Sequence, residues 1–295
     1  MKPRVLVLGV TGMLGHVLMQ EFGKSTELDA FGTARRVELL SSTFPQRILS
    51  RVSSDVDARD FQAIRGVIGR IRPDIVVNCI GIIKQDPGVA DRANTIALNA
   101  LLPHLLAQEC NQLNVRLIHI STDCVFSGHK GNYTEGDIPD PVDFYGQSKL
   151  LGEVVGPHAL TLRTSIIGHE LKSSKSLVDW FLSESGSVHG YTKAIYTGVT
   201  TYELARILMF VVFPRTHLKG LFHVASDPIS KFELLSTIAK EYHWPGDIVP
   251  SDEVACDRSL SAAAFFAETG YSPPPWPEMV AAMRRSATVR GFTAR

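Results

Sequence analysis

Apolar positions along the first half of the chain follow two alternating patterns. Continuous apolar runs at residues 4–8, 74–79 and 115–120 are typical of strands buried on both faces of a sheet. Between these runs, apolar residues recur at the spacing of one helix face, as in the stretch 61–71. Strands that alternate with helices in this way favour a parallel sheet covered by helices on both sides.

The same patterns predict where the individual elements lie. We expect strands at residues 4–8, 28–33, 51–54, 74–79, 115–120, 160–165 and 221–225. We expect helices at residues 14–22, 61–71, 96–113, 144–155, 177–183, 202–213, 232–242 and 276–284. Residues 128–143, which are rich in Gly, Pro and Asp, predict a surface loop between two of these elements.

Composition and charge narrow the class of protein. The 295 residues include 30 basic and 30 acidic side chains, so no overall field would attract nucleic acid or an anionic membrane. No apolar run reaches the length of a membrane span, and the run near the N-terminus is too short for a signal peptide. The four cysteines lack zinc or disulfide spacing, and no histidine pair has H-E-x-x-H spacing. We therefore expect a cytoplasmic protein with reduced thiols and no metal.

A glycine-rich turn joins the first predicted strand to the first helix. Gly9, Gly12 and Gly15 permit a tight turn, a close approach of the backbone to a pyrophosphate, and close packing of helix on strand. The first backbone N–H groups of the helix, near Met13 and Leu14, would then face the phosphates. Although the spacing differs from G-x-G-x-x-G and three glycines can simply form a turn, this strand–turn–helix context favours a dinucleotide site.

Two arginines indicate which dinucleotide binds. Arg35 lies 20 residues after Gly15, where an acidic residue would hold the ribose of NAD, and Arg36 follows it. Guanidinium groups pair well with phosphate, so the sequence predicts NADPH (NADP+), with its additional 2′-phosphate. The alternative is a pair of solvated arginines at the end of a strand.

The clean alternation of strands and helices fades after about residue 166. The expected fold class is α/β, a Rossmann-type doubly wound parallel sheet with a smaller C-terminal substrate-binding lobe. Residues 1–166 would form the NADP-binding Rossmann domain, and residues 167–295 would form mainly the lobe. Later segments such as 191–225 are expected to return to the first domain.

A second set of residues predicts carbonyl chemistry. Tyr145 and Lys149 lie four residues apart at the start of a helix, hence on one face. We expect the cation to lower the pKa of the phenol and make it a usable general acid. Thr122 ends an apolar strand, where ligands of open parallel sheets bind and where its hydroxyl could donate to a carbonyl. Glycine turn, strand-end hydroxyl and Y-x-x-x-K together predict a ketone reductase.

These motifs carry a resemblance to a known family. The stretches 121–128, 131–135 and 145–153 resemble the extended short-chain dehydrogenases/reductases, and within these the dTDP-4-dehydrorhamnose reductases. The resemblance implies an NADPH-dependent oxidoreductase that delivers hydride to the 4-keto group of a nucleotide-linked 6-deoxyhexose, for surface polysaccharide synthesis. Tyr145 would protonate the new alkoxide, Lys149 would bind the nicotinamide ribose, and Thr122 would hold the carbonyl oxygen.

The resemblance also assigns further contacts. Additional cofactor-binding residues would be Asp55, Val56, Cys79, Ile80, Gly81, Asn99 and Ser165. The substrate would contact Asp123 and Cys124 beside Thr122 and Tyr145. From their chemistry, Lys84 could meet a substrate group, and Arg163 and Arg258 could each contact a substrate diphosphate, although solvation is an equal alternative for all three. Because Cys124 stands where these reductases usually carry Tyr, and Lys84 lies in a divergent loop, both dTDP-linked and UDP-linked sugars stay open.

Three alternatives use the same scaffold. A 4,6-dehydratase would need Glu in place of Cys124, and a 4-epimerase needs tightly held NAD, against which Arg35 and Arg36 argue. A non-catalytic regulatory subunit, like that of methionine adenosyltransferase, resembles the same reductases, although Thr122, Tyr145 and Lys149 are intact. A homodimer is compatible with the sequence, which does not reveal the oligomeric state. His119, inside an apolar strand, is expected to be a core histidine.

Overall fold

The computed structural model describes residues 2–84, 87–171 and 175–289. Its central element is a seven-stranded sheet with the order β10-β6-β5-β4-β1-β2-β3, in which every pairing is parallel. Its strands are β1 Arg4–Leu8, β2 Asp29–Thr33, β3 Val52–Ser53, β4 Ile75–Asn78, β5 Arg116–Thr122, β6 Ala159–Thr164 and β10 Gly220–His223. The order reverses at β1, which lies between β2 and β4. This confirms the predicted doubly wound sheet and places its switch point beside β1.

The period of two along β1 explains why the sheet is buried on both faces. Val5 and Val7 point into one apolar core, which includes Val17 and Leu18 of helix α1 (Met13–Phe22). Leu6 and Leu8 point into a second core formed with helices α3 (Phe61–Ile71) and α5 (Leu102–Gln112). Each strand residue therefore packs against a helix layer, as the continuous apolar runs predict.

Among the remaining helices of the described residues, those at residues 46–49, 92–95 and 263–269 were not predicted, and the others lie at predicted positions. The remaining helices are α2 Gln46–Leu49, α4 Arg92–Thr95, α6 Phe144–Leu151, α7 Leu177–Ser183, α8 Thr201–Arg206, α9 Lys231–Tyr242, α10 Ala263–Thr269 and α11 Trp276–Val289. Short 3-10 turns are η1 Val37–Leu40, η2 Pro87–Ala90 and η4 Asp123–Val125, and wide π-helical turns are η3 Ile96–Leu101 and η5 Ile207–Val212. The helix expected at 96–113 thus begins with a wide turn, and the one expected at 144–155 ends at Leu151, before Gly152.

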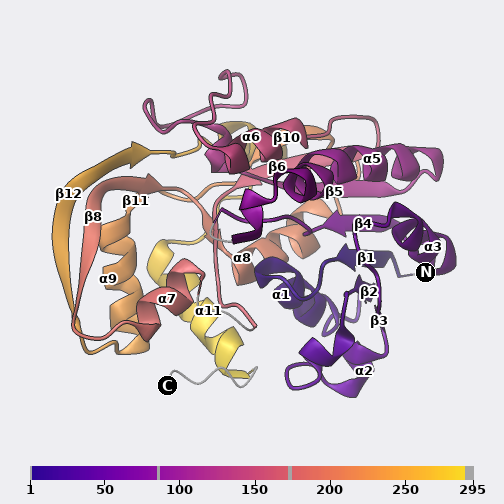
Figure 1. Cartoon of the computed structure of the whole chain (residues 1–295), viewed down its shortest axis with the longest axis horizontal. Coiled ribbons are helices and arrows are strands. Elements are labelled where there is room, and N and C mark those ends of the chain that lie inside the picture. Colours follow the sequence, from indigo (N-terminus) through magenta and orange to yellow (C-terminus); the bar gives the residue numbers. More distant parts are fainter. Residues whose placement is uncertain (1, 85–86, 172–174, 290–295) are drawn as a thin grey trace.

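A second part of the molecule is built around a three-stranded sheet with the order β11-β8-β12. The long parallel strands β8 (Ser187–Tyr196) and β12 (Asp247–Asp257) curve along one side of the molecule, with α9 beside them (Figure 1). β11 (Ile229–Ser230) completes this sheet, and β7 (Ile166–Ile167) pairs with β9 (Val199–Thr200). The sequence analysis missed β8 and β12, because most of β12 is exposed and carries no apolar period.

The chain crosses between the two parts more than once. After β8 in the second part, β10 returns to the edge of the seven-stranded sheet beside β6. The division near residue 166 stays a prediction. Within the described residues, no helix combines the length and apolar character needed to cross a bilayer.

Candidate functional site

The predicted site residues follow the carboxyl ends of neighbouring parallel strands. Gly9 follows β1, Arg35 follows β2, Asp55 follows β3, Cys79 follows β4, and Thr122 ends β5. Because all these strands run in one direction, their carboxyl ends meet at the same edge of the sheet. The fold therefore gathers segments that are more than 100 residues apart in the sequence.

The glycine turn has the geometry of an anion-binding loop. Gly9 has a φ of +84°, which favours glycine, and a side-chain carbon on Gly15 would lie 2.2 Å from the carbonyl oxygen of Gly9. Gly12 is the N-cap residue of α1, and no side chain caps this end of the helix. The backbone N–H groups of Met13 and Leu14 are the first of the helix. The free N–H groups and the positive end of the helix dipole fit a diphosphate.

The segments after β2 and β3 are tied to this turn. The N–H of Val10 donates to Thr33 at 3.0 Å, and the N–H of Val56 donates to Ala34 at 3.1 Å. Arg35 and Arg36, the next two residues after Ala34, are both exposed. Asp55 is also exposed and has a φ of +60°. The segment that precedes the two arginines is thus tied to the glycine turn, and their predicted contact with a 2′-phosphate stays a prediction.

Asn99 holds the segment after β4. Its Oδ1 accepts from the N–H of Ile82 at 2.8 Å, and its Nδ2 donates to the Ile82 carbonyl at 2.9 Å and to Ser148 Oγ at 3.0 Å. Both amide hydrogens of this fully buried side chain are therefore engaged within the protein. Asn99 therefore holds Gly81 and Ile82 against α6. Its predicted contact with the cofactor stays a prediction.

The carbonyl of Ser165 is also engaged. It accepts from the N–H of Val199 at 2.9 Å, which joins the segment after β6 to β9. Ser165 therefore links the seven-stranded sheet to the second part of the molecule. Its predicted contact with the cofactor stays a prediction.

Tyr145 and Thr122 face each other across the start of α6. The helix begins here because Asp143 caps it, with its Oδ1 accepting from the N–H of Gly146 at 2.8 Å. Thr122 Oγ1 donates to Asp123 Oδ1 at 3.1 Å and accepts from the N–H of Cys124 at 3.1 Å. A hydrogen bond with Thr122 acts to lower the pKa of Tyr145, so the two hydroxyls are neighbours. The structure therefore brings together the predicted acid and the predicted carbonyl donor.

The electrostatics of the pair differ from the expectation. Burial raises the pKa of Tyr145 well above its usual range, and nearby Cys124 and Asp123 add to the effect. The expected lowering by Lys149 is wrong for this structure, because loss of solvation outweighs the opposing influences. Burial also lowers the pKa of Lys149 to about 8, while Glu153 acts in the opposite direction. Burial therefore opposes the charged form of both groups.

Arg258 joins the site from the second part of the molecule. It follows β12, and its Nε donates to the Phe126 carbonyl at 2.9 Å while its Nη1 lies 3.6 Å from Cys124 Sγ. Burial raises the pKa of Asp123, and the charge of Arg258 opposes this shift without cancelling it. The predicted substrate residues Asp123, Cys124 and Arg258 are thus brought together.

Two further residues, Tyr196 and Cys256, lie near Asp123 and were not predicted from the sequence. Burial raises the pKa of Tyr196, in β8, to about 12, and nearby Asp123 and Cys256 add to the shift. Cys256 lies at the end of β12, with its Sγ 3.8 Å from the Ser127 carbonyl. The signal that could have revealed Tyr196 was the strand β8 itself, since its end faces the group around Asp123.

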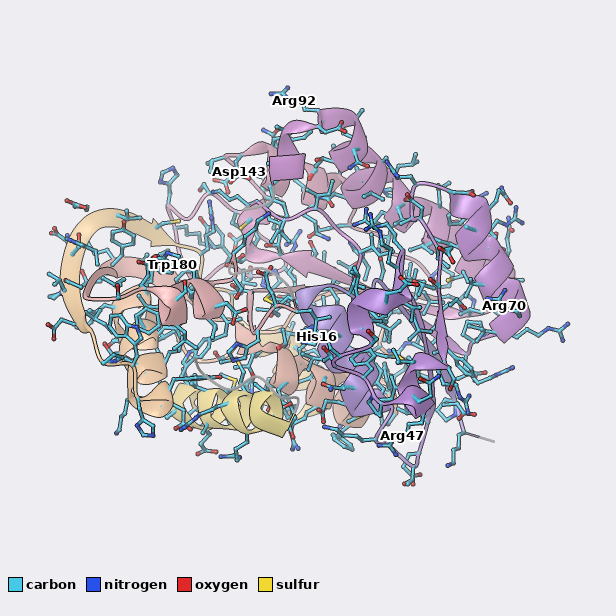
Figure 2. The ribbon with its side chains drawn as sticks, turned by 60° about the horizontal axis from the view of Figure 1, so that its bottom comes forward. His16, Arg47, Arg70, Arg92, Asp143 and Trp180 are labelled. Carbon is cyan, nitrogen blue, oxygen red and sulfur yellow. The ribbon has the colours of Figure 1, made fainter. Side chains whose placement is uncertain are left out.

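Lys84 and Arg163 have partners within the protein. Lys84 Nζ forms an ion pair with Asp143 Oδ2 at 2.8 Å, and its side chain is half exposed beside the start of α6. Asp143 lies on the same side of the molecule as Arg92 of α4 (Figure 2). Arg163, considered in the sequence for a substrate diphosphate or for solvent, is instead buried in an ion pair with Glu153 at 2.7 Å.

Comparison with known proteins identifies the family. Residues 2–284 match the family described as the RmlD substrate binding domain. The chain belongs to the RmlD substrate-binding domain family.

Several known members and structures are similar to this RmlD-family chain. Methionine adenosyltransferase 2 subunit beta of Danio rerio is 31% identical over 271 residues, 85% of this chain and 77% of that protein. A hypothetical dTDP-4-dehydrorhamnose reductase from Sulfolobus tokodaii is 26% identical, with a TM-score of 0.75 over 92% of this chain and 98% of that one. The dTDP-4-dehydrorhamnose reductase of Bacillus anthracis, solved with NADP, is 22% identical, with a TM-score of 0.77 over 97% and 99% of the chains. The resemblance drawn from the motifs and the predicted fold class are both confirmed.

Proposed function

We propose that this RmlD-family chain is an NADPH-dependent reductase of the 4-keto group of a nucleotide-linked (dTDP or UDP) 6-deoxy-4-hexulose. The observation that carries the proposal is the neighbouring pair of Tyr145 and Thr122, with Lys149 one helical turn further along α6, at the sheet edge that also holds the glycine turn. The Bacillus anthracis reductase, which has this fold, was solved with NADP. The proposal places the enzyme in the cytoplasm, where it would supply sugars for a surface polysaccharide.

The residues of the site suit the protonation half of this reaction. Bound NADPH would supply the hydride, which adds to the carbonyl carbon and leaves negative charge on its oxygen. Because burial raises the pKa of Tyr145, the phenol carries its proton and can donate it to that oxygen. The Thr122 hydroxyl, which donates to Asp123 in this structure, would rotate to donate to the carbonyl oxygen.

The substrate's diphosphate would be held on the other side of the site. Arg258 carries the positive charge there, and Tyr196 offers a phenol beside it. A planar guanidinium binds phosphate oxygens well, so Arg258 suits one phosphate group of the nucleotide. Cys124 lies in η4 beside Arg258, and Lys84 pairs with Asp143 at the start of α6. Both would line the path by which the substrate enters.

The first test is turnover. Purified protein with NADPH and a panel of dTDP- and UDP-linked 4-keto-6-deoxy sugars should oxidise NADPH with at least one member. Tyr145→Phe should keep NADPH binding and lose about two to four orders of magnitude in kcat, the usual contribution of a general acid. Tyr202→Phe, on α8, is the matched control and should stay active. Retained turnover in Tyr145→Phe would remove the acid role.

The choice of NADPH has a separate test. Replacing Arg35 and Arg36 together with Ala should weaken NADPH binding by more than about tenfold and leave NADH binding nearly unchanged. Arg47→Ala is the control, because Arg47 is exposed at the outer edge of α2, away from Asp143 (Figure 2). Equal weakening of both cofactors would contradict the 2′-phosphate assignment and make an NAD-retaining epimerase the better interpretation.

A second candidate function is a non-catalytic regulatory subunit. The observation that favours it is the 31% identity to methionine adenosyltransferase 2 subunit beta over 85% of this chain. If the sugar panel gives no turnover while NADPH binds, and the chain comigrates with a methionine adenosyltransferase catalytic subunit in gel filtration, this function replaces the reductase. Turnover with a sugar nucleotide and no comigration would exclude it.

A further inference from the structure

His119 lies directly beneath the lysine of the site. It belongs to β5, its side chain is fully buried, and the proposed reduction gives it no part. Its Nδ1 is 3.1 Å from Asn78 Nδ2, and its Nε2 is 3.5 Å from Lys149 Nζ. The imidazole therefore connects the end of β4 to the lysine of α6.

The hydrogen bonds around Asn78 determine which ring nitrogen carries the proton. Asn78 Oδ1 accepts from the backbone N–H of Ile80 at 3.1 Å, so the amide nitrogen must face His119. An amide nitrogen only donates, and His119 Nδ1 must therefore accept. A neutral imidazole that accepts at Nδ1 carries its proton on Nε2, which points towards Lys149.

His119 stays neutral in this position. Burial lowers its pKa well below the usual range, and the nearby Lys149 and His104 act in the same direction. A second proton on Nδ1 would also place one donor against the donor of Asn78. The Nε2–H tautomer is thus the neutral form that accepts from Asn78.

An N–H group directed at Lys149 discriminates between the two forms of the lysine. The ammonium has three donors and no lone pair, whereas the neutral amine can accept a hydrogen bond. The other groups facing Lys149 are the Ile120 carbonyl, which accepts from Nζ at 2.8 Å, the Glu153 carboxylate and the Cys79 thiol. The Ile120 carbonyl and Glu153 favour the ammonium, so His119 is the neighbour whose hydrogen opposes it.

We propose that His119 is a positioning residue, held as the Nε2–H tautomer by Asn78, that makes the Lys149 ammonium a ready proton donor. This inference rests on the proposed reduction. When Tyr145 gives its proton to the new alkoxide, an O–H bond must form again on the phenolate. The N–H bond of Lys149 that breaks to supply this proton breaks more easily because His119 favours the neutral amine.

The first measurement concerns the protein without turnover. In the NADP+ complex labelled with 15N-histidine, NMR should show His119 protonated at Nε2, with the signal assigned by its loss in His119→Phe. In protein labelled with 15N-lysine, His119→Phe should raise the midpoint of the Lys149 titration by about half a pH unit or more. His189→Phe, which replaces an exposed histidine of β8, should leave it unchanged.

A second variant separates the tautomer from the size of the side chain. Asn78→Asp replaces the donor by an acceptor, so His119 should move its proton to Nδ1 and accept from Lys149 at Nε2. Asn78→Asp should then raise the Lys149 titration midpoint more when His119 is present than when it is combined with His119→Phe. In the combined variant only the added negative charge acts on Lys149. Equal rises in both backgrounds, or an Nδ1–H tautomer in the parent protein, would overturn the inference.

The reaction itself gives a third measurement. Since the ammonium is the donor, the rate of reduction should fall on the alkaline side, and His119→Phe should move that decline to higher pH by the same amount as the NMR midpoint. A decline that does not move, in an enzyme that reduces its sugar, overturns this inference alone. If no sugar is reduced, the proposed function fails, while the tautomer and the lysine midpoint still decide whether His119 acts on Lys149.

Discussion

Replacing Glu153 by Gln should cost more stability than replacing any exposed charge of this protein. Arg163 Nη2 lies 2.7 Å from Glu153 Oε2, and Arg163 Nε lies 2.8 Å from Oε1, with side-chain exposures of 5% and 8%. Ser121 also donates to Oε1 at 2.7 Å. An amide in place of the carboxylate would keep the shape of the side chain but leave the buried guanidinium without its counter-charge.

The magnitude follows from burial. Removing one partner of a buried ion pair costs about 3–5 kcal/mol, because the other charge stays buried and unpaired. The control is Asp252→Asn, which breaks the Lys193–Asp252 pair at exposures of 58% and 73%. An exposed pair of this kind contributes less than about 1 kcal/mol. The assay is urea unfolding, in which the free energy of unfolding of each protein is extrapolated to water with the same dependence on urea concentration.

A double replacement tests the reasoning behind the number. Glu153→Gln combined with Arg163→Met removes both charges, so it should be less destabilising than the sum of the single changes by at least about 1 kcal/mol. The reasoning is refuted if Glu153→Gln is as mild as Asp252→Asn, or if the two changes at the buried pair are additive. Either result would mean that water or another group balances the charge of Arg163.

Three further predictions concern the glycine turn, the lysine and the arginine of the site. Gly15→Ala should abolish NADPH binding, since the added carbon meets backbone at 2.2 Å, whereas Gly66→Ala, with no atom within 4 Å, should stabilise α3 by up to about 1 kcal/mol, as binding and urea unfolding would show. Because the pKa of Lys149 falls from 10.5 to about 8 on folding, the unfolded chain holds more protons between these values. The free-energy cost of burying the Lys149 charge is therefore complete below pH 8 and disappears towards pH 10.5. Lys149→Met removes this cost, so it should raise Tm at about pH 7 and lose this advantage at about pH 10. Arg258→Ala should raise KM for the sugar nucleotide at least about tenfold and leave the Kd of NADPH unchanged in fluorescence titration.

The parallel sheet could be predicted because burial on both faces leaves a direct trace in the sequence. β1 and β4 consist almost entirely of apolar residues, and the segments between the strands show a helical period. β12 leaves no such trace, since most of its residues are exposed, and burial in β8 alternates only over residues 187–190. Their position is determined by pairing with each other and by packing on α9, which no local pattern reveals.

In the candidate site, too, the sequence predicted which residues take part but not how deeply each side chain is buried. Tyr145, Lys149 and Thr122 could be found from motifs, because their spacing is a property of the chain. Arg163 could not be placed, since its burial depends on Glu153, on the face of Phe126 at 5.1 Å, and on its position within the sheet. A charged side chain near the end of a strand can face solvent or a buried partner, and only the tertiary structure decides between them.

The environment of the Tyr145–Lys149 pair also bears on the direction of the reaction. Burial opposes charge on both side chains, so it raises the pKa of Tyr145 and lowers that of Lys149 together. Reduction begins with a protonated phenol, which is the form that burial favours. Oxidation of the alcohol would begin with the phenolate, which burial disfavours, so its rate should rise steeply with pH above neutrality. The pair is therefore suited to reduction at neutral pH, and an oxidation rate that stayed level from about pH 7 to about pH 10 would contradict this account of Tyr145.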